Sequence, residues 1–112
     1  MLFVFAEDGT LEVVADLAEV HRRYEPIDVE SGVFIFYDER GQPLDPVFTQ
    51  PNRERRVFGL FTILEQGIYE LTPSTDSKQD PFLVALNEVA VLEPNPWFRS
   101  IEDVRRFITA AP

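Results

Sequence analysis

Cysteine is absent from this 112-residue chain, and lysine, histidine and tryptophan occur once each. The lack of cysteine excludes disulfides, thiolate nucleophiles and thiolate metal ligands, and it makes a reducing cytoplasm the expected location. No apolar run approaches the roughly 18 residues that a membrane helix needs. The apolar segment 1–6 is followed at once by Glu7 and Asp8, which is typical of a strand and not of a signal peptide. We therefore expect no membrane partner.

Glycine is also scarce, with five residues, and none of them forms a phosphate-binding loop. The GxSxG, HExxH and CxxC patterns are absent as well. The single histidine, His21, would need a nucleophile and an orienting acid to act as a general base. Glu25 could supply the acid, but no nucleophile motif is present. We therefore expect His21 to be an exposed or half-buried helix residue, and we expect no enzyme and no cofactor.

Acidic residues are what the chain has in excess. Twenty Asp and Glu against ten Lys and Arg give a formal net charge of -10. Residues 1–52 hold eleven acids against three bases, whereas residues 53–112 hold nine against seven. An acidic surface would therefore be built mainly by the N-terminal half, and it would attract a basic partner. The same charge also fits a solvated coat that only keeps the protein soluble.

Seven carboxylates of this half are the candidate partner-binding residues: Glu7, Asp8, Asp28, Glu30, Asp38, Glu39 and Asp45. Adjacent acids among them could in principle hold a hard cation. However, neighbours in sequence point apart on a strand or helix, and no tract has the alternating oxygen-ligand spacing of a calcium loop. Turn and helix-start positions account for these acids, so we predict no metal site.

One concentrated basic run is present, formed by Arg53, Arg55 and Arg56 and followed by Phe58 and Phe61. Arginines on phosphates and aromatic rings on bases would make a nucleic-acid site. Counterion release rewards larger clusters, and the chain as a whole is acidic. If residues 56–64 form one strand, the two rings lie on opposite faces and at least one belongs to the core. We expect a solvated basic loop and no nucleic-acid partner.

Apolar periodicity and turn residues predict the order of the elements. Asp8-Gly9 suits a tight hairpin, and Asp16 with Glu19 suits a helix N-terminal capping box. The expected strands are 2–6, 11–15, 33–37, 56–64 and 68–71, with brief extended or edge segments at 27–29 and 43–49. The expected helices are 16–25, 81–90 and 101–109, and the expected loops are 51–54 and 72–80.

This order predicts a single α+β domain over residues 1–112, with a mainly antiparallel sheet of five to six strands and three short helices. Strands 2–6, 33–37 and 57–64 are apolar on both faces, so both faces of the sheet need cover. Three short helices leave part of that surface for a second copy or another protein. Trp97, before the last helix, is expected to pack as a hydrophobic staple, and an interface position is the alternative.

Two stretches, 25–32 (EPIDVESG) and 36–44 (FYDERGQPL), resemble small acidic bacterial proteins. Some of those proteins are similar in size and composition to toxin-neutralising immunity proteins. The resemblance implies a bacterial, cytoplasmic and non-catalytic protein, and it assigns no functional residue.

Two functions therefore stay open. The first is an acidic protein-binding module, of immunity or inhibitor type, that neutralises a basic partner. The second is a structural or regulatory subunit that forms a homodimer through an apolar sheet face, with its acidity serving solubility alone.

Overall fold

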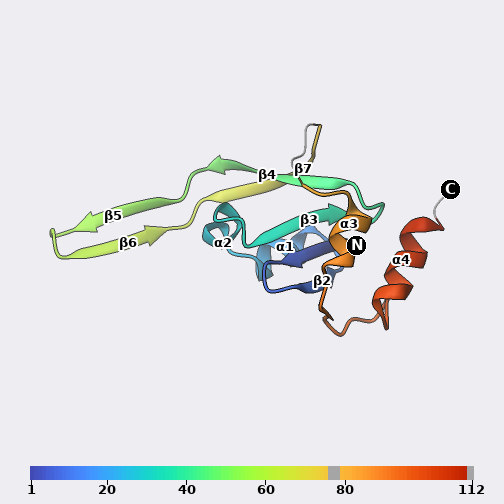
Figure 1. The fold of residues 1–112 in the computed structure, drawn as a ribbon. Helices are drawn as coiled ribbons and strands as arrows, with labels where there is room; N and C mark the ends of the chain where they lie inside the picture. Colours follow the sequence, from blue (N-terminus) through green and yellow to red (C-terminus); the bar gives the residue numbers. More distant parts are fainter. Residues whose placement is uncertain (76–78, 111–112) are drawn as a thin grey trace.

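The computed structural model describes residues 1–75 and 79–110, shown as a ribbon in Figure 1. It contains eight strands and four helices within these residues. The strands are β1 (Leu2–Ala6), β2 (Thr10–Val14), β3 (Phe34–Asp38), β4 (Pro43–Gln50), β5 (Arg53–Val57), β6 (Phe61–Glu65), β7 (Ile68–Pro73) and β8 (Val91–Leu92). The helices are α1 (Leu17–Arg23), α2 (Pro26–Glu30), α3 (Phe82–Asn87) and α4 (Ile101–Thr109).

Six of the strands form one sheet in the order β7-β4-β3-β1-β2-β8, and β5 and β6 form a separate two-stranded sheet. Every pairing is antiparallel except that of β2 with β8, which is parallel. The expected α+β class with a mainly antiparallel sheet is confirmed. The number of helices is four, one more than expected.

Alternation along β1 builds a core on each face of the six-stranded sheet. Leu2 and Val4 join the cluster beneath α1 and α2, which also contains Val20, Tyr24 and Val29. Phe3 and Phe5 point to the opposite face, where they join residues of α3, of α4 and of the segment before α4: Phe82, Leu86, Val104 and Phe98. Successive side chains of a strand point to opposite faces, so one apolar strand supplies both cores. The expectation that both faces of strand 2–6 are covered is confirmed.

Local signals set the two longest helices. The Asp16 carboxylate accepts the backbone N–H of Glu19 at 2.9 Å, and the Ser100 hydroxyl accepts that of Asp103 at 3.1 Å. Both are helix N-caps of the expected kind. Helix α3 differs, because its cap position is Pro81 with no side-chain hydrogen bond, and the helix begins at Phe82.

Two proline-containing segments depart from expectation. Residues 27–29 are not extended but lie in α2, whose first residue is Pro26, where a missing N–H costs nothing. The prediction that residues 43–49 form an edge segment is wrong, because β4 lies inside the sheet, between β3 and β7. Its contact with β3 covers only Leu44 and Pro43, so Pro46 has a neighbouring strand on one side alone and needs no second ladder bond.

The largest departure concerns residues 56–64, which are not one strand but the end of a hairpin. β5 and β6 pair from Arg53 opposite Glu65 to Val57 opposite Phe61, with a turn between them. Neither Phe58 nor Phe61 enters the core. Part of the predicted loop 72–80 is strand, since β7 runs to Pro73, and positions 76–78 of that prediction lie outside the described residues.

Candidate functional site

The β5–β6 hairpin projects from the body as an arm, which we define as residues 53–65 (Figure 1). The molecule measures 57 × 29 × 23 Å, and its Cα radius of gyration is 15.9 Å. A compact domain of this length has a radius of gyration of about 13 Å. None of the arm's residues belongs to either core cluster. The arm is therefore surface added to a body that folds around other residues.

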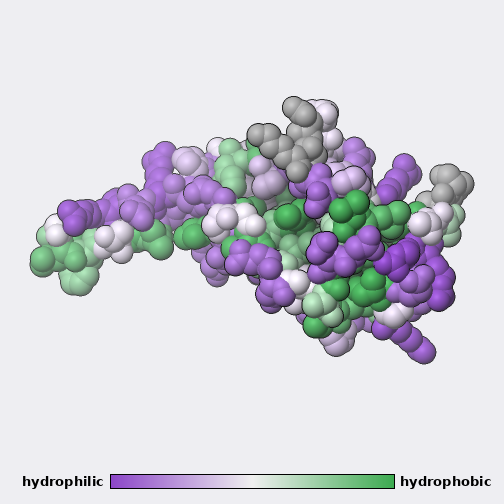
Figure 2. Space-filling model, viewed as in Figure 1, coloured by the Kyte–Doolittle hydropathy of each residue, from purple (hydrophilic) through white to green (hydrophobic). Residues whose placement is uncertain are grey.

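Large apolar side chains cover the tip of the arm. Phe58 is 90% exposed, Leu60 82% and Phe61 65%. Figure 2 shows a group of hydrophobic residues at the far end of the arm, in addition to the hydrophobic surface visible on the body. Folding alone gives no reason to leave such side chains in water, and contiguous exposed apolar surface marks interaction sites.

The turn at the tip is strained at one residue. Phe58 has a φ of 56° and Gly59 a φ of 68°, and the Leu60 N–H donates to the Val57 carbonyl at 3.3 Å. Two positive φ angles are the requirement of a type I′ hairpin turn, which Asn-Gly or Asp-Gly usually fills. A bulky residue at positive φ is an outlier and is often found where function demands that side chain.

The two edges of the arm differ in chemistry. β5 carries Arg53, Glu54, Arg55 and Arg56, whereas β6 carries no charge before its last residue. Both outer edges are unpaired, because the hairpin has only two strands. Charged side chains protect an edge strand from pairing with another chain, and an apolar edge invites it. The β6 edge is thus open to strand addition, and the β5 edge is protected.

The base of the arm is fixed by one asparagine. The Asn52 amide donates to the Pro26 carbonyl at 3.1 Å and to the Glu30 carboxylate at 3.2 Å. Its oxygen accepts the N–H of Gly67 at 2.6 Å. A Cβ on Gly67 would lie 2.0 Å from the Gln50 carbonyl oxygen, so only glycine fits there. These contacts join both strands of the arm to α2 and set the direction in which the arm leaves the body.

Below this base lies an apolar hollow of about 390 Å³ at the outer edge of β7. Its lining is His21, Pro26, Gly67, Ile68, Tyr69 and Glu70. His21 is exposed, as expected, and its ring centroid lies 4.9 Å from that of Tyr69. The Tyr69 hydroxyl donates to the Tyr24 carbonyl at 2.8 Å, and burial raises the pKa of Tyr69 to about 12. Tyr69 is thus a neutral, fixed wall of the hollow.

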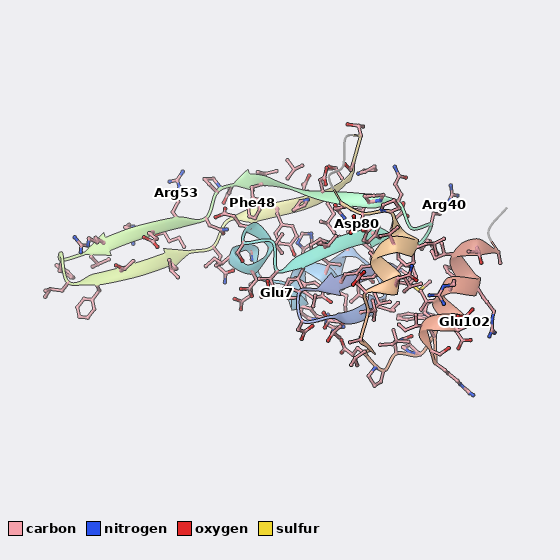
Figure 3. All side chains as sticks on the ribbon, viewed as in Figure 1. Glu7, Arg40, Phe48, Arg53, Asp80 and Glu102 are labelled. Carbon is pink, nitrogen blue, oxygen red and sulfur yellow. The ribbon has the colours of Figure 1, made fainter. Side chains whose placement is uncertain are left out.

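The seven predicted partner-binding acids do not converge on one surface. Glu7 and Asp8 lie in the β1–β2 turn, and Asp28 and Glu30 lie in α2. The turn and the end of α2 are close together, because the Glu7 N–H donates to the Val33 carbonyl at 3.0 Å. Asp38 ends β3, Glu39 follows in the turn, and Asp45 lies early in β4, at the other end of these strands. Figure 3 labels Glu7 and Arg40, which mark the two ends.

Several of these acids also have a structural use. Asp38 accepts the N–H groups of Arg40 and Gln42 at 2.8 and 2.9 Å, and Asp8 accepts that of Thr10 at 3.0 Å. Such bonds stabilise turns, as the turn interpretation predicts. Within residues 1–75 and 79–110, no group of three His, Cys, Asp or Glu side chains is placed to hold a metal ion.

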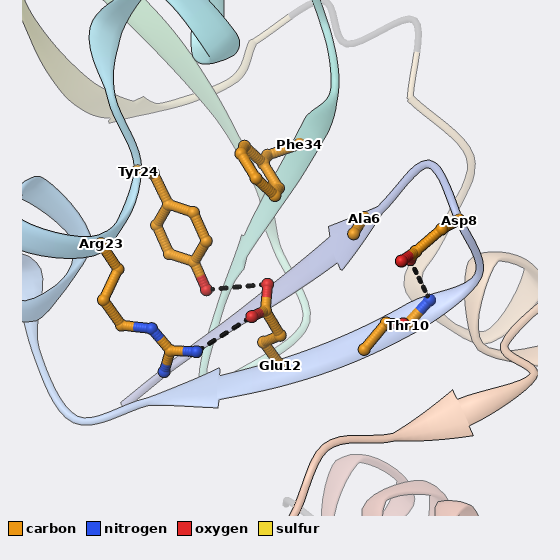
Figure 4. A pocket seen from close by; sticks show the side chains of 7 residues that line it. All are labelled: Ala6, Asp8, Thr10, Glu12, Arg23, Tyr24 and Phe34. Carbon is orange, nitrogen blue, oxygen red and sulfur yellow. Dashed lines mark hydrogen bonds and ion pairs between the residues drawn. The ribbon is translucent and has the colours of Figure 1, made fainter.

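A second polar cluster, which sequence reasoning missed, lies where β2 and α1 meet (Figure 4). Arg23 donates to Glu12 at 2.9 Å and to Glu93 at 3.1 Å, and the Tyr24 hydroxyl donates to Glu12 at 3.1 Å. Burial raises the pKa of Glu12 to about 6, and the neighbouring Glu93 carboxylate adds to the shift, while Tyr24 and Arg23 oppose it. The same burial raises the pKa of Tyr24 above its ordinary value.

This cluster borders a hollow of about 400 Å³ lined by Ala6, Asp8, Thr10, Glu12, Arg23, Tyr24 and Phe34. Each of its charges is met within the chain by a partner of opposite sign or a hydroxyl. The cluster joins α1, β2 and the segment after β8, so its contacts have a structural role in the fold. Periodicity gave no signal for it, because Glu12, Arg23 and Glu93 are far apart in sequence.

Trp97 is half-exposed, so the prediction that it packs as a hydrophobic staple is wrong. Phe98 occupies the core position instead, with its ring 5.8 Å from Phe3 and 5.3 Å from Phe107. The Asn95 side chain accepts the N–H groups of both Trp97 and Phe98, and this turn directs Phe98 inward.

Comparison of the chain with protein-family models, with curated proteins and with solved structures finds no match. No described helix is long and apolar enough to cross a membrane. Any proposal of function must therefore be based on the geometry of the arm and not on similarity to known proteins.

Proposed function

We propose that this protein is a protein-binding module and that its binding element is the β5–β6 arm. The observation that carries the proposal is the open β6 edge, in which Phe61, Ile63 and Leu64 are exposed on a strand with unpaired backbone groups. Main-chain hydrogen bonds of an added strand supply affinity in this mode of recognition, and alternate side chains supply specificity. An isolated two-stranded hairpin is only marginally stable in water, so an added strand would also stabilise the arm.

Binding at this edge can be tested with one pair of variants. Ile63 is 43% exposed in β6 and Leu83 is 40% exposed in α3, so Ile63→Lys and Leu83→Lys place the same charge on equally exposed apolar sites. Isotope-labelled wild type and both variants are immobilised, and proteins retained from a cell lysate are quantified by mass spectrometry. The labelling lets copies of the chain itself be counted among the retained proteins.

The expected result is at least one protein retained by the wild type and by Leu83→Lys, and depleted about tenfold or more by Ile63→Lys, because a charge at a paired edge is strongly unfavourable. Identical retention by all three proteins would contradict the proposal.

The acidic end of the sheet supports a second candidate, the neutralisation of a basic partner predicted from the sequence. Its observation is that Glu7, Asp8, Asp28 and Glu30 are exposed and lie at one end of the body. Such a group of charges raises association rates with a basic surface, and salt lowers them. Stopped-flow association of a retained basic protein should slow with salt, and Glu7→Gln with Asp28→Asn should slow it further than Glu39→Gln at the far end. A rate independent of salt would exclude this candidate.

A further inference from the structure

We propose that the partner of the arm is a second copy of this chain, and that the two β6 strands pair antiparallel into a four-stranded intermolecular sheet. This inference rests on the proposed function, because it names the partner of the same β6 edge. The strand order across the sheet is β5 and β6 of one copy, followed by β6 and β5 of the second copy. The two bodies then lie at opposite ends of the paired arms.

Charge decides which edges pair. Pairing β5 with β5 would set Arg53, Arg55 and Arg56 against arginines of the second copy, and like charges opposite one another destabilise a sheet. Pairing β5 with β6 would leave one open edge on each copy and would add copies without closing. Pairing β6 with β6 has neither fault. The one charged residue of β6, Glu65, already forms an ion pair with Arg55 at 3.4 Å.

Symmetry fixes the register. A twofold axis perpendicular to a sheet leaves every side chain on its own face, so it must pass between two copies of one residue. With the axis at Ile63, the middle of β6, all five residues of each strand pair. Ile63 then faces Ile63 of the second copy, and Leu64 faces Thr62. Phe61 and Ile63 share one face of the arm with Arg55 and Glu65. This register places the Ile63 side chains of the two copies side by side at the centre of that face, with each Phe61 opposite Glu65 of the second copy.

The same register gives the strained tip a place to bind. Continued beyond Phe61, it brings Leu60 level with Gln66 of the second copy, and Phe58, which lies opposite Leu60 across the turn, reaches the same level, two residues before Ile68. Ile68 is half-exposed and borders the hollow beneath the base of the arm, which lies on the outer edge of β7. β6 is followed along the chain by β7 (Figure 1), so the second arm, paired along the outer edge of β6, approaches the outer edge of β7, where the hollow lies. The apolar tip of each copy therefore meets an apolar hollow of the other.

Charge complementarity favours this contact over others between copies. Three arginines against two glutamates give the arm a net positive charge, in a chain whose net charge is -10. Contact between two acidic bodies would bring like charges together, whereas the paired arms keep the bodies apart. Each arm instead ends beside the base of the other copy, where Glu30 and Glu70 lie.

Disulfide cross-linking tests the register directly, because the chain has no cysteine of its own. Ile63→Cys places two thiols across the axis, where Cα atoms of opposite residues are about 4.5–5.5 Å apart, within disulfide range. Arg55→Cys is the matched control, since Arg55 pairs with Ile63 on the outer strand. Two copies of residue 55 are separated by three strand spacings, about 14 Å, which a disulfide cannot span. We expect oxidation to yield a cross-linked dimer of Ile63→Cys and to leave Arg55→Cys monomeric.

Sedimentation supplies the second measurement. The wild type should have twice the 12.9 kDa mass of one chain, and Ile63→Lys should weaken the dimer more than about tenfold, while Leu83→Lys leaves it intact. Near-ultraviolet circular dichroism of Trp97, which lies far from the arm in the body, shows whether Ile63→Lys remains folded. A 12.9 kDa wild type at every concentration, or equal cross-linking of the two cysteine variants, would overturn the proposal.

The two proposals fail in different ways. If the wild type is monomeric but retains a lysate protein that Ile63→Lys loses, the second copy is the wrong partner and the β6 edge is still the binding element. If Ile63→Lys changes neither the mass nor the retained proteins, both proposals are wrong.

Discussion

At the scale of single residues, Phe58 shows a conflict between local geometry and exposure. Its φ of 56° belongs to the left-handed region, and its side chain is 90% exposed, so neither backbone preference nor burial favours phenylalanine there. Asparagine suits the turn better, because it tolerates this conformation. The ring therefore stabilises something other than the isolated chain.

Phe58→Asn should accordingly stabilise the arm and weaken binding through it. Removal of the left-handed strain should stabilise the hairpin by about 1 kcal/mol, which raises the hydrogen-exchange protection of its amides about fivefold. Exchange is measured in the Ile63→Lys background, so that self-association does not contribute. In the otherwise wild-type chain the same change should lower dimer affinity, because the tip loses its apolar contact. Weaker protection in the first measurement would show that the turn is not strained.

Glu12 makes stability depend on pH. Its folded pKa is raised from 4.5 to about 6, so the folded chain binds this proton more tightly than the unfolded chain does. The stability that comes from protonated Glu12 is complete below pH 4.5 and is lost as pH rises through 6. The glutamine of the Glu12→Gln variant cannot titrate. The unfolding free energy of the variant minus that of the wild type should therefore increase as pH rises from 4.5 to 7. Urea unfolding at both pH values measures this gain.

Glu7→Gln, at an exposed carboxylate, controls for the loss of one negative charge. A constant difference between Glu12→Gln and wild type across this pH range would mean that burial does not perturb Glu12.

At the scale of elements, the base of the arm depends on a residue without a side chain. Gly67→Ala would place a Cβ 2.0 Å from the Gln50 carbonyl oxygen and would displace the Gly67 N–H from Asn52. The loss should be about 2–3 kcal/mol of unfolding free energy. Gly32→Ala is the control, since it meets no atom within 4 Å and has only the strain of a φ of 79°, about 1 kcal/mol. Urea unfolding compares the two, and equal losses would contradict a close approach at the base.

The elements that sequence predicted well are those with local signals. Apolar alternation marks β1, Asp16 marks the start of α1, and apolar periodicity marks α4, and each was found where expected. The predictions for the proline-containing segments α2 and β4 were wrong. Proline lacks a backbone N–H, so its cost depends on whether that N–H would have had a hydrogen-bond partner, and this is decided by the sheet and not by the local sequence.

The arm was missed for a related reason. Its turn residues, Phe58 and Gly59, lack the Asn or Asp that usually announces a type I′ turn, and its apolar residues were assigned to a core that they do not enter. Of the seven predicted acids, Asp38 and Asp45 are half-buried and the other five are exposed. Their grouping depends on which turns the sheet brings to one end.

At the scale of the whole molecule, the body should fold without the arm. Replacement of Arg53–Glu65 by Asn-Gly joins Asn52 to Gln66, so that a short loop connects β4 to β7, and it removes no core side chain. We expect a thermal midpoint within a few degrees of that of Ile63→Lys, and a radius of gyration near 13 Å by X-ray scattering. Loss of cooperative unfolding would show that the arm supports the body.

The two faces of the sheet are joined through β1, whose Leu2 and Val4 enter one core and whose Phe3 and Phe5 enter the other. If either core loses its packing, β1 loses part of its support, and the other core needs the same strand. The body therefore has no half that can melt while the rest persists, and calorimetry should show one transition in which calorimetric and van't Hoff enthalpies agree. Because β1 precedes α4 in the chain, a nascent protein makes this strand before α4, and the strand gains both cores only when α4 has emerged.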